Sequence, residues 1–287
     1  MRAGTAPATV AAVVTALLTA LVTAPPAAAA PGPGARTCGD SVERTVVTGD
    51  VEVVGTCRLL RVVVLGDVHV APGARAYLVD SQVVGDLHVG RDARATAQGT
   101  DVRGGVHLDD ALQLRTTGAV GRSVRGRATE VEIAGRVAGA VNVAFPFDAV
   151  HTGLFLHGAT VGGWVNVYGG QNVVLASRLG RGLTLSWSRR TAVCETTVQA
   201  DVTVRRARRD VQLGDVSRLS PEWLGCSVER LPVRGQYRGD LVLEDNVAGV
   251  AVENTDVAGD LVCRRNDVVP VLTSDVTVGG SRVGQCG

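Results

Sequence analysis

The stretch Gly66-Asp67-Val68-His69-Val70 decides the fold, because it recurs at a nearly constant interval. It returns as GDLHV at residues 85–89 and as GGVHL at residues 104–108. Each copy joins a Gly-Asp turn to an apolar-polar-apolar triplet, the period-two pattern of a strand with one buried face. Weaker copies place their turns near Asp50, Ala140, Gly163, Arg181, Asp201, Asp240 and Asp260. A unit of about 17 to 20 residues that repeats in this way indicates a solenoid.

The repeat favours strands over helices. β-branched residues and glycine are abundant, and no stretch with a 3.6-residue apolar period follows the first thirty residues. A short unit with turns at Gly-Asp and at [Ser/Thr]-x-Val-x-Gly closes into a triangular coil. No strict six-residue repeat runs through residues 67–106, and variable rung length favours the right-handed form. We therefore predict an all-β fold, a single-stranded right-handed parallel β-helix of about a dozen rungs.

The N-terminal region predicts export. Arg2, an apolar stretch at residues 10–22 and a run of alanines at residues 27–30 match a secretory signal peptide. We expect a signal peptide at residues 1–29, a Pro/Gly/Ala linker at 30–37, and a β-helix at 38–287 with an inserted loop around 205–235. No later apolar stretch is long enough to span a membrane. The predicted protein is secreted, either released or associated with the cell wall.

Six cysteines in an exported chain suggest three disulfides, although fifteen pairings are formally possible. Cys38 and Cys57 are one rung apart, so stacking would bring their Cα atoms to about 4.8 Å, within disulfide range. Cys263 and Cys286 are separated by a rung and a short excursion near the other end. The remaining pair, Cys194 and Cys226, spans the disturbed part of the repeat. The spacing thus predicts a bridge at each end and one across the inserted loop.

The middle residues of the repeated strands form the candidate metal site. In a stacked coil, residues one rung apart lie in a column, and this column begins with Glu52, His69, His88 and His107. Imidazole and carboxylate groups bind zinc or copper, and a stack with a spacing of about 4.8 Å brings them within reach of one ion. The alternative is that repeat duplication copied an outward-facing histidine. No other cofactor is expected.

Two further ladders have structural explanations. The turn aspartates Asp50, Asp67 and Asp86 are expected to cap backbone amides. Asn246 and Asn266 lie 20 residues apart, which predicts a hydrogen-bonded asparagine ladder.

Charge identifies no partner for the whole chain, because arginines and acids nearly balance. One local group of basic residues is expected to lie on two neighbouring rungs: Arg189, Arg190, Arg205, Arg206, Arg208 and Arg209. Such a patch suits an anionic wall polymer or an acidic glycan, unless it is a solvated face paired with nearby acids. No nucleic-acid-binding module accompanies it, so specific nucleic-acid binding is not expected.

The chain also resembles known proteins. Its Gly-Asp-Val-x-Val rungs, the segment Cys263-Arg264-Arg265-Asn266 and the closing residues 278–286 look like a group of exported actinobacterial β-helix proteins. The similarity covers about residues 38–286. The repeat is similar in kind to that of bactofilins, whose right-handed β-helices polymerise into cytoplasmic filaments. This chain departs from that pattern in its export signal and its terminal cysteines. The resemblance implies a β-helix fold and export from the cell, and it implies no catalytic residues.

These observations predict a monomeric, non-enzymatic structural or binding protein that presents a rigid β-helix face, with a wall or extracellular glycan as the expected partner. A polysaccharide lyase or hydrolase is also compatible with the sequence, because an acidic stretch offers carboxylates and Trp164, Tyr168 and Trp187 offer sugar-stacking rings. The carboxylates are Asp240, Glu244, Asp245, Glu253, Asp256 and Asp260. The histidine column makes metal binding a third hypothesis, and the stacked repeat makes filament formation a fourth.

Overall fold

The computed structural model describes residues 35–146, 152–214, 234–247 and 249–287. In these residues every regular element is a strand and none is a helix, so this part of the chain contains no helix able to cross a membrane. The expected signal peptide at residues 1–29 lies outside the described residues. The β-helix begins slightly earlier than expected, because Arg36 already pairs in parallel with Val51 on the next rung.

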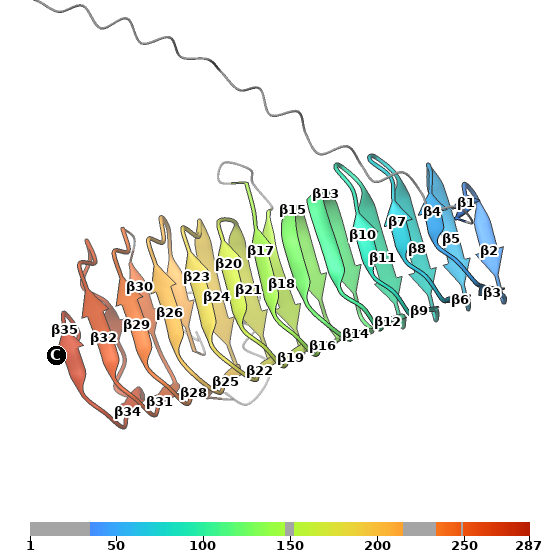
Figure 1. Ribbon diagram of the computed structural model, residues 1–287. Coiled ribbons are helices and arrows are strands. Elements are labelled where there is room, and N and C mark those ends of the chain that lie inside the picture. Colours follow the sequence, from blue (N-terminus) through green and yellow to red (C-terminus); the bar gives the residue numbers. More distant parts are fainter. Residues whose placement is uncertain (1–34, 147–151, 215–233, 248) are drawn as a thin grey trace, which may run out of the picture. The chain divides into compact units, whose positions relative to one another are not determined.

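The strands stack in parallel to form three faces of a β-solenoid (Figure 1). The first face comprises β1 (Arg36–Cys38), β4 (Val51–Val53), β7 (Val68–Val70), β10 (Leu87–Val89), β13 (Val106–Thr116), β15 (Val124–Ile133), β17 (Val141–Ala144), β20 (Val165–Tyr168), β23 (Leu183–Ser186), β26 (Val202–Arg205), β29 (Leu241–Glu244), β32 (Leu261–Arg264) and β35 (Arg282–Gly284). The second comprises β2 (Ser41–Glu43), β5 (Thr56–Leu60), β8 (Arg75–Val79), β11 (Arg94–Gln98), the later parts of β13 and β15, β18 (Gly153–His157), β21 (Gln171–Leu175), β24 (Arg190–Cys194), β27 (Val211–Leu213), β30 (Val250–Val252) and β33 (Val271–Leu272).

The third face comprises β3 (Val46–Val47), β6 (Val63–Val64), β9 (Gln82–Val83), β12 (Asp101–Val102), β14 (Ala119–Val120), β16 (Arg136–Val137), β19 (Thr160–Val161), β22 (Arg178–Leu179), β25 (Thr197–Val198), β28 (Gly235–Tyr237), β31 (Thr255–Val257) and β34 (Thr277–Val278). These 12 strands form one sheet, and the first two faces form a second sheet because β13 and β15 run through both. The predicted parallel β-helix of about a dozen rungs is confirmed. Its handedness stays a prediction.

The core follows from the period-two pattern. Val68 and Val70 point inward and are buried, whereas His69 between them is half-buried on the outer surface. Repeated on successive rungs, this pattern makes one continuous core of valine, leucine and alanine that reaches from Cys38 to Cys286. Each interior rung packs on its two neighbours, so the core becomes longer as rungs are added and does not become wider.

The Gly-Asp turn joins one rung to the next. Asp67 Oδ1 accepts a hydrogen bond from the Asp86 amide at 2.7 Å, and Asp86 Oδ1 accepts one from the Gly105 amide at 2.7 Å. Glycine precedes the aspartate because the turns approach closely: a Cβ on Gly85 would lie 2.0 Å from Asp67 Oδ1 and 2.6 Å from the Gly66 carbonyl oxygen. The predicted capping by turn aspartates is confirmed, and the capped amide belongs to the following rung.

Both predicted terminal disulfides are present. Cys38 is bonded to Cys57 with the Cα atoms 5.7 Å apart, and Cys263 to Cys286 with the Cα atoms 5.4 Å apart. Cys194 is buried and disulfide-bonded, while its expected partner Cys226 lies outside the described residues. Each end of the described solenoid is therefore covalently closed.

The interruption of the repeat is shorter than the predicted loop around 205–235. Strand β27 lies inside that range and pairs with β24 and β30, so the second face continues through it. On the third face β25 pairs directly with β28, although Thr197 and its partner Gln236 are 39 positions apart. Strand pairing therefore confines the insertion to the chain between β27 and β28.

A buried asparagine ladder links the rungs on either side of the insertion. Asn246 Oδ1 accepts the Ala207 amide at 2.9 Å, and Asn246 Nδ2 donates to the Val204 carbonyl at 3.1 Å. Asn266 Oδ1 accepts from both the amide and the side chain of Asn246, at 3.1 and 2.9 Å. The predicted ladder is confirmed, and it ties the rung after the insertion to the rung before it.

Candidate metal centre

The four predicted ligand residues lie in one column on the first face. Glu52 is in register with His69, His69 with His88, and His88 with His107, on strands β4, β7, β10 and β13. Each side chain lies between two neighbours that point inward, so it points away from the core. The prediction that parallel stacking aligns these residues is confirmed.

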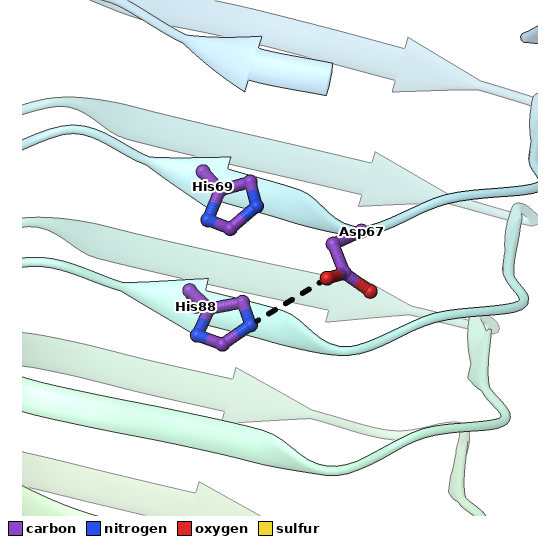
Figure 2. A group of neighbouring side chains, drawn as sticks. All are labelled: Asp67, His69 and His88. Atoms are coloured by element: carbon purple, nitrogen blue, oxygen red, sulfur yellow. Dashed lines mark ion pairs between the residues drawn. The ribbon is translucent and has the colours of Figure 1, made fainter. Parts of the chain in front are cut away.

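The three imidazole rings stack on one another. The ring centroids of His69 and His88 are 4.6 Å apart and those of His88 and His107 are 4.7 Å apart, with 11° between the planes in both pairs. Figure 2 shows His69 and His88 in matching orientations on adjacent rungs. The equal rung spacing therefore presents successive ring nitrogens along one line.

Turn aspartates complete the site. Asp67 Oδ2 lies 3.9 Å from His88 Nε2, and Asp67 is oriented toward His88 in Figure 2. Its other oxygen caps the Asp86 amide, so the turn holds the carboxylate in place. Sequence reasoning assigned Asp67 only the capping role. The signal was present, since residues two positions apart share a face of a strand, and Asp67 is two positions before His69.

The structure gathers two groups of three ligand atoms, each within 4.8 Å of one another: Asp67, His69 and His88, and Asp86, His88 and His107. All the members are half-buried. Glu52 continues the column next to His69, but it belongs to neither of the groups found among the described residues. The structure thus brings together the three predicted histidines and replaces the predicted glutamate with aspartates.

In the second group, which consists of Asp86, His88 and His107, hydrogen bonds already occupy both ring nitrogens of His107. His107 Nε2 lies 3.1 Å from Asp86 Oδ2, and Arg125 Nε donates to His107 Nδ1 at 3.0 Å. Arginine has donors only, so His107 Nδ1 must accept, which places the ring proton on Nε2 and directs it to Asp86. Both nitrogens of His107 are occupied, which leaves the group of Asp67, His69 and His88 as the open one.

Sequence reasoning missed Arg125. It lies in register between His107 and Asn142, so it is the next member of the same column. The rung that carries it has Gly121-Arg122-Ser123 in place of the Gly-Asp turn. Because Ser123 still accepts the next turn amide, that of Ala140 at 3.0 Å, this rung is structurally equivalent despite its different sequence.

Electrostatics favour the neutral form of the central histidine. Burial lowers the pKa of His88 from its ordinary value of 6.5, and the neighbouring His69 and His107 lower it further, against the opposing effect of Asp67 and Asp86. The hydrogen bond from the Gly105 amide is the main cause that lowers the pKa of Asp86, with His107 contributing. A neutral imidazole beside an ionised carboxylate is the state that binds a metal cation.

We expect His88 to titrate at lower pH in the folded protein than in the unfolded chain. Between the two pKa values the unfolded state binds more protons, so acidification through the range just below 6.5 should reduce stability. Side-chain NMR of the imidazole from about pH 8 to about pH 4, with and without urea, measures both pKa values. A folded pKa equal to or above the unfolded one would contradict this electrostatic account.

The open group has dimensions that suit a transition metal. Zinc binds histidine nitrogen and carboxylate oxygen at about 2.0 to 2.2 Å, so two ligand atoms of one ion are at most roughly 4.4 Å apart, and about 3.3 to 3.6 Å apart in a tetrahedral site. The 3.9 Å separation of Asp67 Oδ2 and His88 Nε2 falls within that limit. His69 offers a third ligand atom from the adjacent rung, within 4.8 Å of the other two, so the side chains would have to rotate to converge on one ion.

The predicted basic residues lie at the corner between the first and second faces on two successive rungs. Arg205 Nε donates to Ser186 Oγ at 2.9 Å, and the guanidinium carbons of Arg206 and Arg208 lie 5.0 and 5.6 Å from the centroid of the Trp187 ring. Arg206 Nε is also 3.9 Å from Asp245 Oδ2 on the next rung. Arg189, Arg190 and Arg209 occupy the same corner. Aromatic and acidic partners therefore share this region with the arginines.

Comparison of the chain with models of protein families, with curated proteins and with solved structures finds no match in any of the three.

Proposed function

We propose that this protein is an exported, non-enzymatic binding protein that holds a divalent transition metal, zinc or copper, on the first face of its β-solenoid. The observation that carries the proposal is the open group of Asp67, His69 and His88, in which a carboxylate oxygen lies 3.9 Å from an imidazole nitrogen. The lowered pKa of His88 keeps that ligand neutral near pH 7. The rigid stack fixes ligand positions that a loop would leave variable.

Two independent features support export. The first thirty residues have the composition of a secretory signal peptide. The disulfides Cys38–Cys57 and Cys263–Cys286 suit an oxidising compartment. Release from the cell or association with its wall would both place the site in contact with external metal.

The partners of the candidate carboxylates argue for binding rather than glycan cleavage. Glu244 and Asp245 are both paired with Arg265, whose guanidinium nitrogens lie 2.7 and 2.6 Å from their oxygens. Asp240 and Asp260 each cap the amide at the turn of the following rung, at 2.8 Å in both cases. A glycosidase needs two carboxyl groups that are available to substrate, and these four acids are engaged in stabilising the fold.

Replacing His88 with alanine should reduce zinc affinity by on the order of 100-fold, because His88 belongs to both ligand groups. Isothermal titration of the purified protein with Zn²⁺, and separately with Cu²⁺, measures the change. His157→Ala is the matched control, since His157 is an exposed histidine on the second face. His107→Ala should leave affinity close to that of the unchanged protein, because His107 is held by Asp86 and Arg125.

The titrations distinguish the proposed site from the second ligand group and from the absence of any site. An unchanged protein that binds neither metal, or a His88→Ala variant that binds as tightly as the His157→Ala control, would disprove the proposed site. A loss of affinity in His107→Ala as large as in His88→Ala would move the metal to the second group. Thermal unfolding of each variant identifies a loss that is due to misfolding.

A further inference from the structure

A second feature of the first face lies farther along the solenoid, around β20. On three successive rungs, the alternate positions of β17, β20 and β23, together with the residue that precedes each strand, carry no charge. They are Ala140, Asn142 and Ala144, then Trp164, Asn166 and Tyr168, then Gly182, Thr184 and Ser186, of which Gly182 and Ser186 are buried. We call these nine residues the aromatic platform. Its large side chains all come from the central rung, with smaller residues on both sides.

The two aromatic rings of the platform are exposed. Trp164 is 38% exposed and Tyr168 is 44% exposed, although most apolar side chains of the solenoid are buried. Four residues of extended chain separate them, which corresponds to about 13 Å. Trp164 extends over the adjacent rung, because a Cβ on Gly182 would lie 2.1 Å from its Cζ3 atom. The absence of a side chain at Gly182 provides the space for the ring.

Amide groups lie between the rings. Asn166 Nδ2 donates to Asn142 Oδ1 at 2.7 Å, and both side chains are exposed. This bond orients the two amides and leaves an amide donor on Asn142 and a carbonyl acceptor on Asn166. Exposed rings flanking oriented amides are suited to a sugar chain, whose ring faces are apolar and whose hydroxyl groups donate and accept hydrogen bonds.

Arginines border the platform on both sides. Arg125 is two rungs before Asn166 in the same column, and Arg205 is two rungs after Tyr168 in the same column. The side chains to which they donate hydrogen bonds are uncharged, namely a ring nitrogen of His107 and the hydroxyl of Ser186. The acids near Arg205 have other partners: Asp201, directly before β26, caps the Asp240 amide, and Glu244, in register with Arg205 on β29, is paired with Arg265. The platform is therefore neutral between two positive borders, which complements a sugar chain with anionic groups.

We propose that the aromatic platform binds an acidic polysaccharide, with pyranose rings stacked on Trp164 and Tyr168 and carboxylate groups directed toward Arg125 and Arg205. Trp187, the third ring expected from the sequence, lies beneath Arg206 and Arg208 at the corner of the solenoid. Polysaccharide binding at the platform is separate from metal binding at the histidine column. It uses different residues of the same face and requires no ion.

Affinity electrophoresis in gels containing polygalacturonate tests the proposal, with amylose as the neutral probe and EDTA present to exclude metal. The unchanged protein should be retarded by polygalacturonate and not by amylose. Trp164→Ala combined with Tyr168→Ala should weaken the binding by about tenfold or more. Tyr77→Ala is the matched control, because Tyr77 is 38% exposed but lies on the second face. Its retardation should equal that of the unchanged protein.

Arg205→Gln provides a test that leaves both rings intact. It should weaken retardation by polygalacturonate several-fold and reduce its dependence on salt, because one charge contact is lost. Absence of retardation in the unchanged protein, or equal loss in the double variant and in Tyr77→Ala, would overturn the proposed site. Equal retardation by amylose would overturn the acidic specificity. Thermal unfolding of the double variant should match that of the unchanged protein, since both rings lie on the surface.

Discussion

Asn246→Ala is expected to lower the free energy of unfolding by roughly 3 to 5 kcal/mol, because it leaves several buried polar groups without partners. Asn246 is fully buried. Its side chain accepts from the Ala207 amide and donates to the Val204 carbonyl and to Asn266. Each of those groups would remain inside the protein with no water to replace the lost bond. Unfolding in urea, followed by circular dichroism, measures the difference.

Asn166→Ala is the matched control for this substitution. Asn166 also belongs to a ladder of asparagines in adjacent rungs, with its Nδ2 atom 2.7 Å from Asn142 Oδ1, but its side chain is exposed. Water can replace that bond, so the expected change is within about 0.5 kcal/mol. Equal effects of the two substitutions would show that the buried ladder does not hold the rungs on either side of the insertion.

The second large effect is expected at the N-terminal end of the described solenoid. Cys38→Ala combined with Cys57→Ala should cost about 2 to 5 kcal/mol of stability, as is typical of native disulfides in secreted domains. Among the described residues the first rung pairs with one other rung only, so the Cys38–Cys57 bond supplies constraint that interior rungs obtain from packing on both sides. Alanine avoids the burial of a new hydroxyl at two buried positions.

Hydrogen exchange locates this effect. In the double variant the amides of β1, β2 and β3 should exchange faster, while amides near β20 should keep their protection. A reducing agent should have the same effect on the first rung of the unchanged protein and no effect on that rung in the variant. Unchanged protection of β1 to β3 in the double variant would show that the bridge is not required to hold the first rung.

The fold was predictable because the sequence of one repeat unit specifies both its buried face and its turn. The triplet Val68-His69-Val70 specifies the buried face, and the Gly-Asp turn specifies where the next rung begins. Once the period was known, the histidine column and the terminal disulfides followed from residue spacing. These predictions depend on backbone register, which a repeat determines directly.

The remaining features of the site depend on side-chain geometry. The side-chain torsion angle of Asp67 decides whether its Oδ2 atom faces His88. Residue spacing in the sequence does not specify that angle. The role of Arg125 could not be predicted because its rung keeps the shape of the turn but lacks the Gly-Asp sequence that identifies the repeat. The extent of the insertion was overestimated because the residues around Val211 carry no repeat signature, although β27 pairs on both sides.

The turn that links successive rungs has a genetic consequence. Each aspartate receives an amide from the rung that follows it, so every interior rung of this type presents the same acceptor on one side and the same donor on the other. An in-frame duplication of residues 67–85 would insert a rung that fits both of its neighbours and adds one turn aspartate and one histidine to the column. Such a duplication would lengthen the ligand column by one rung, between Glu52 at one end and Arg125 at the other.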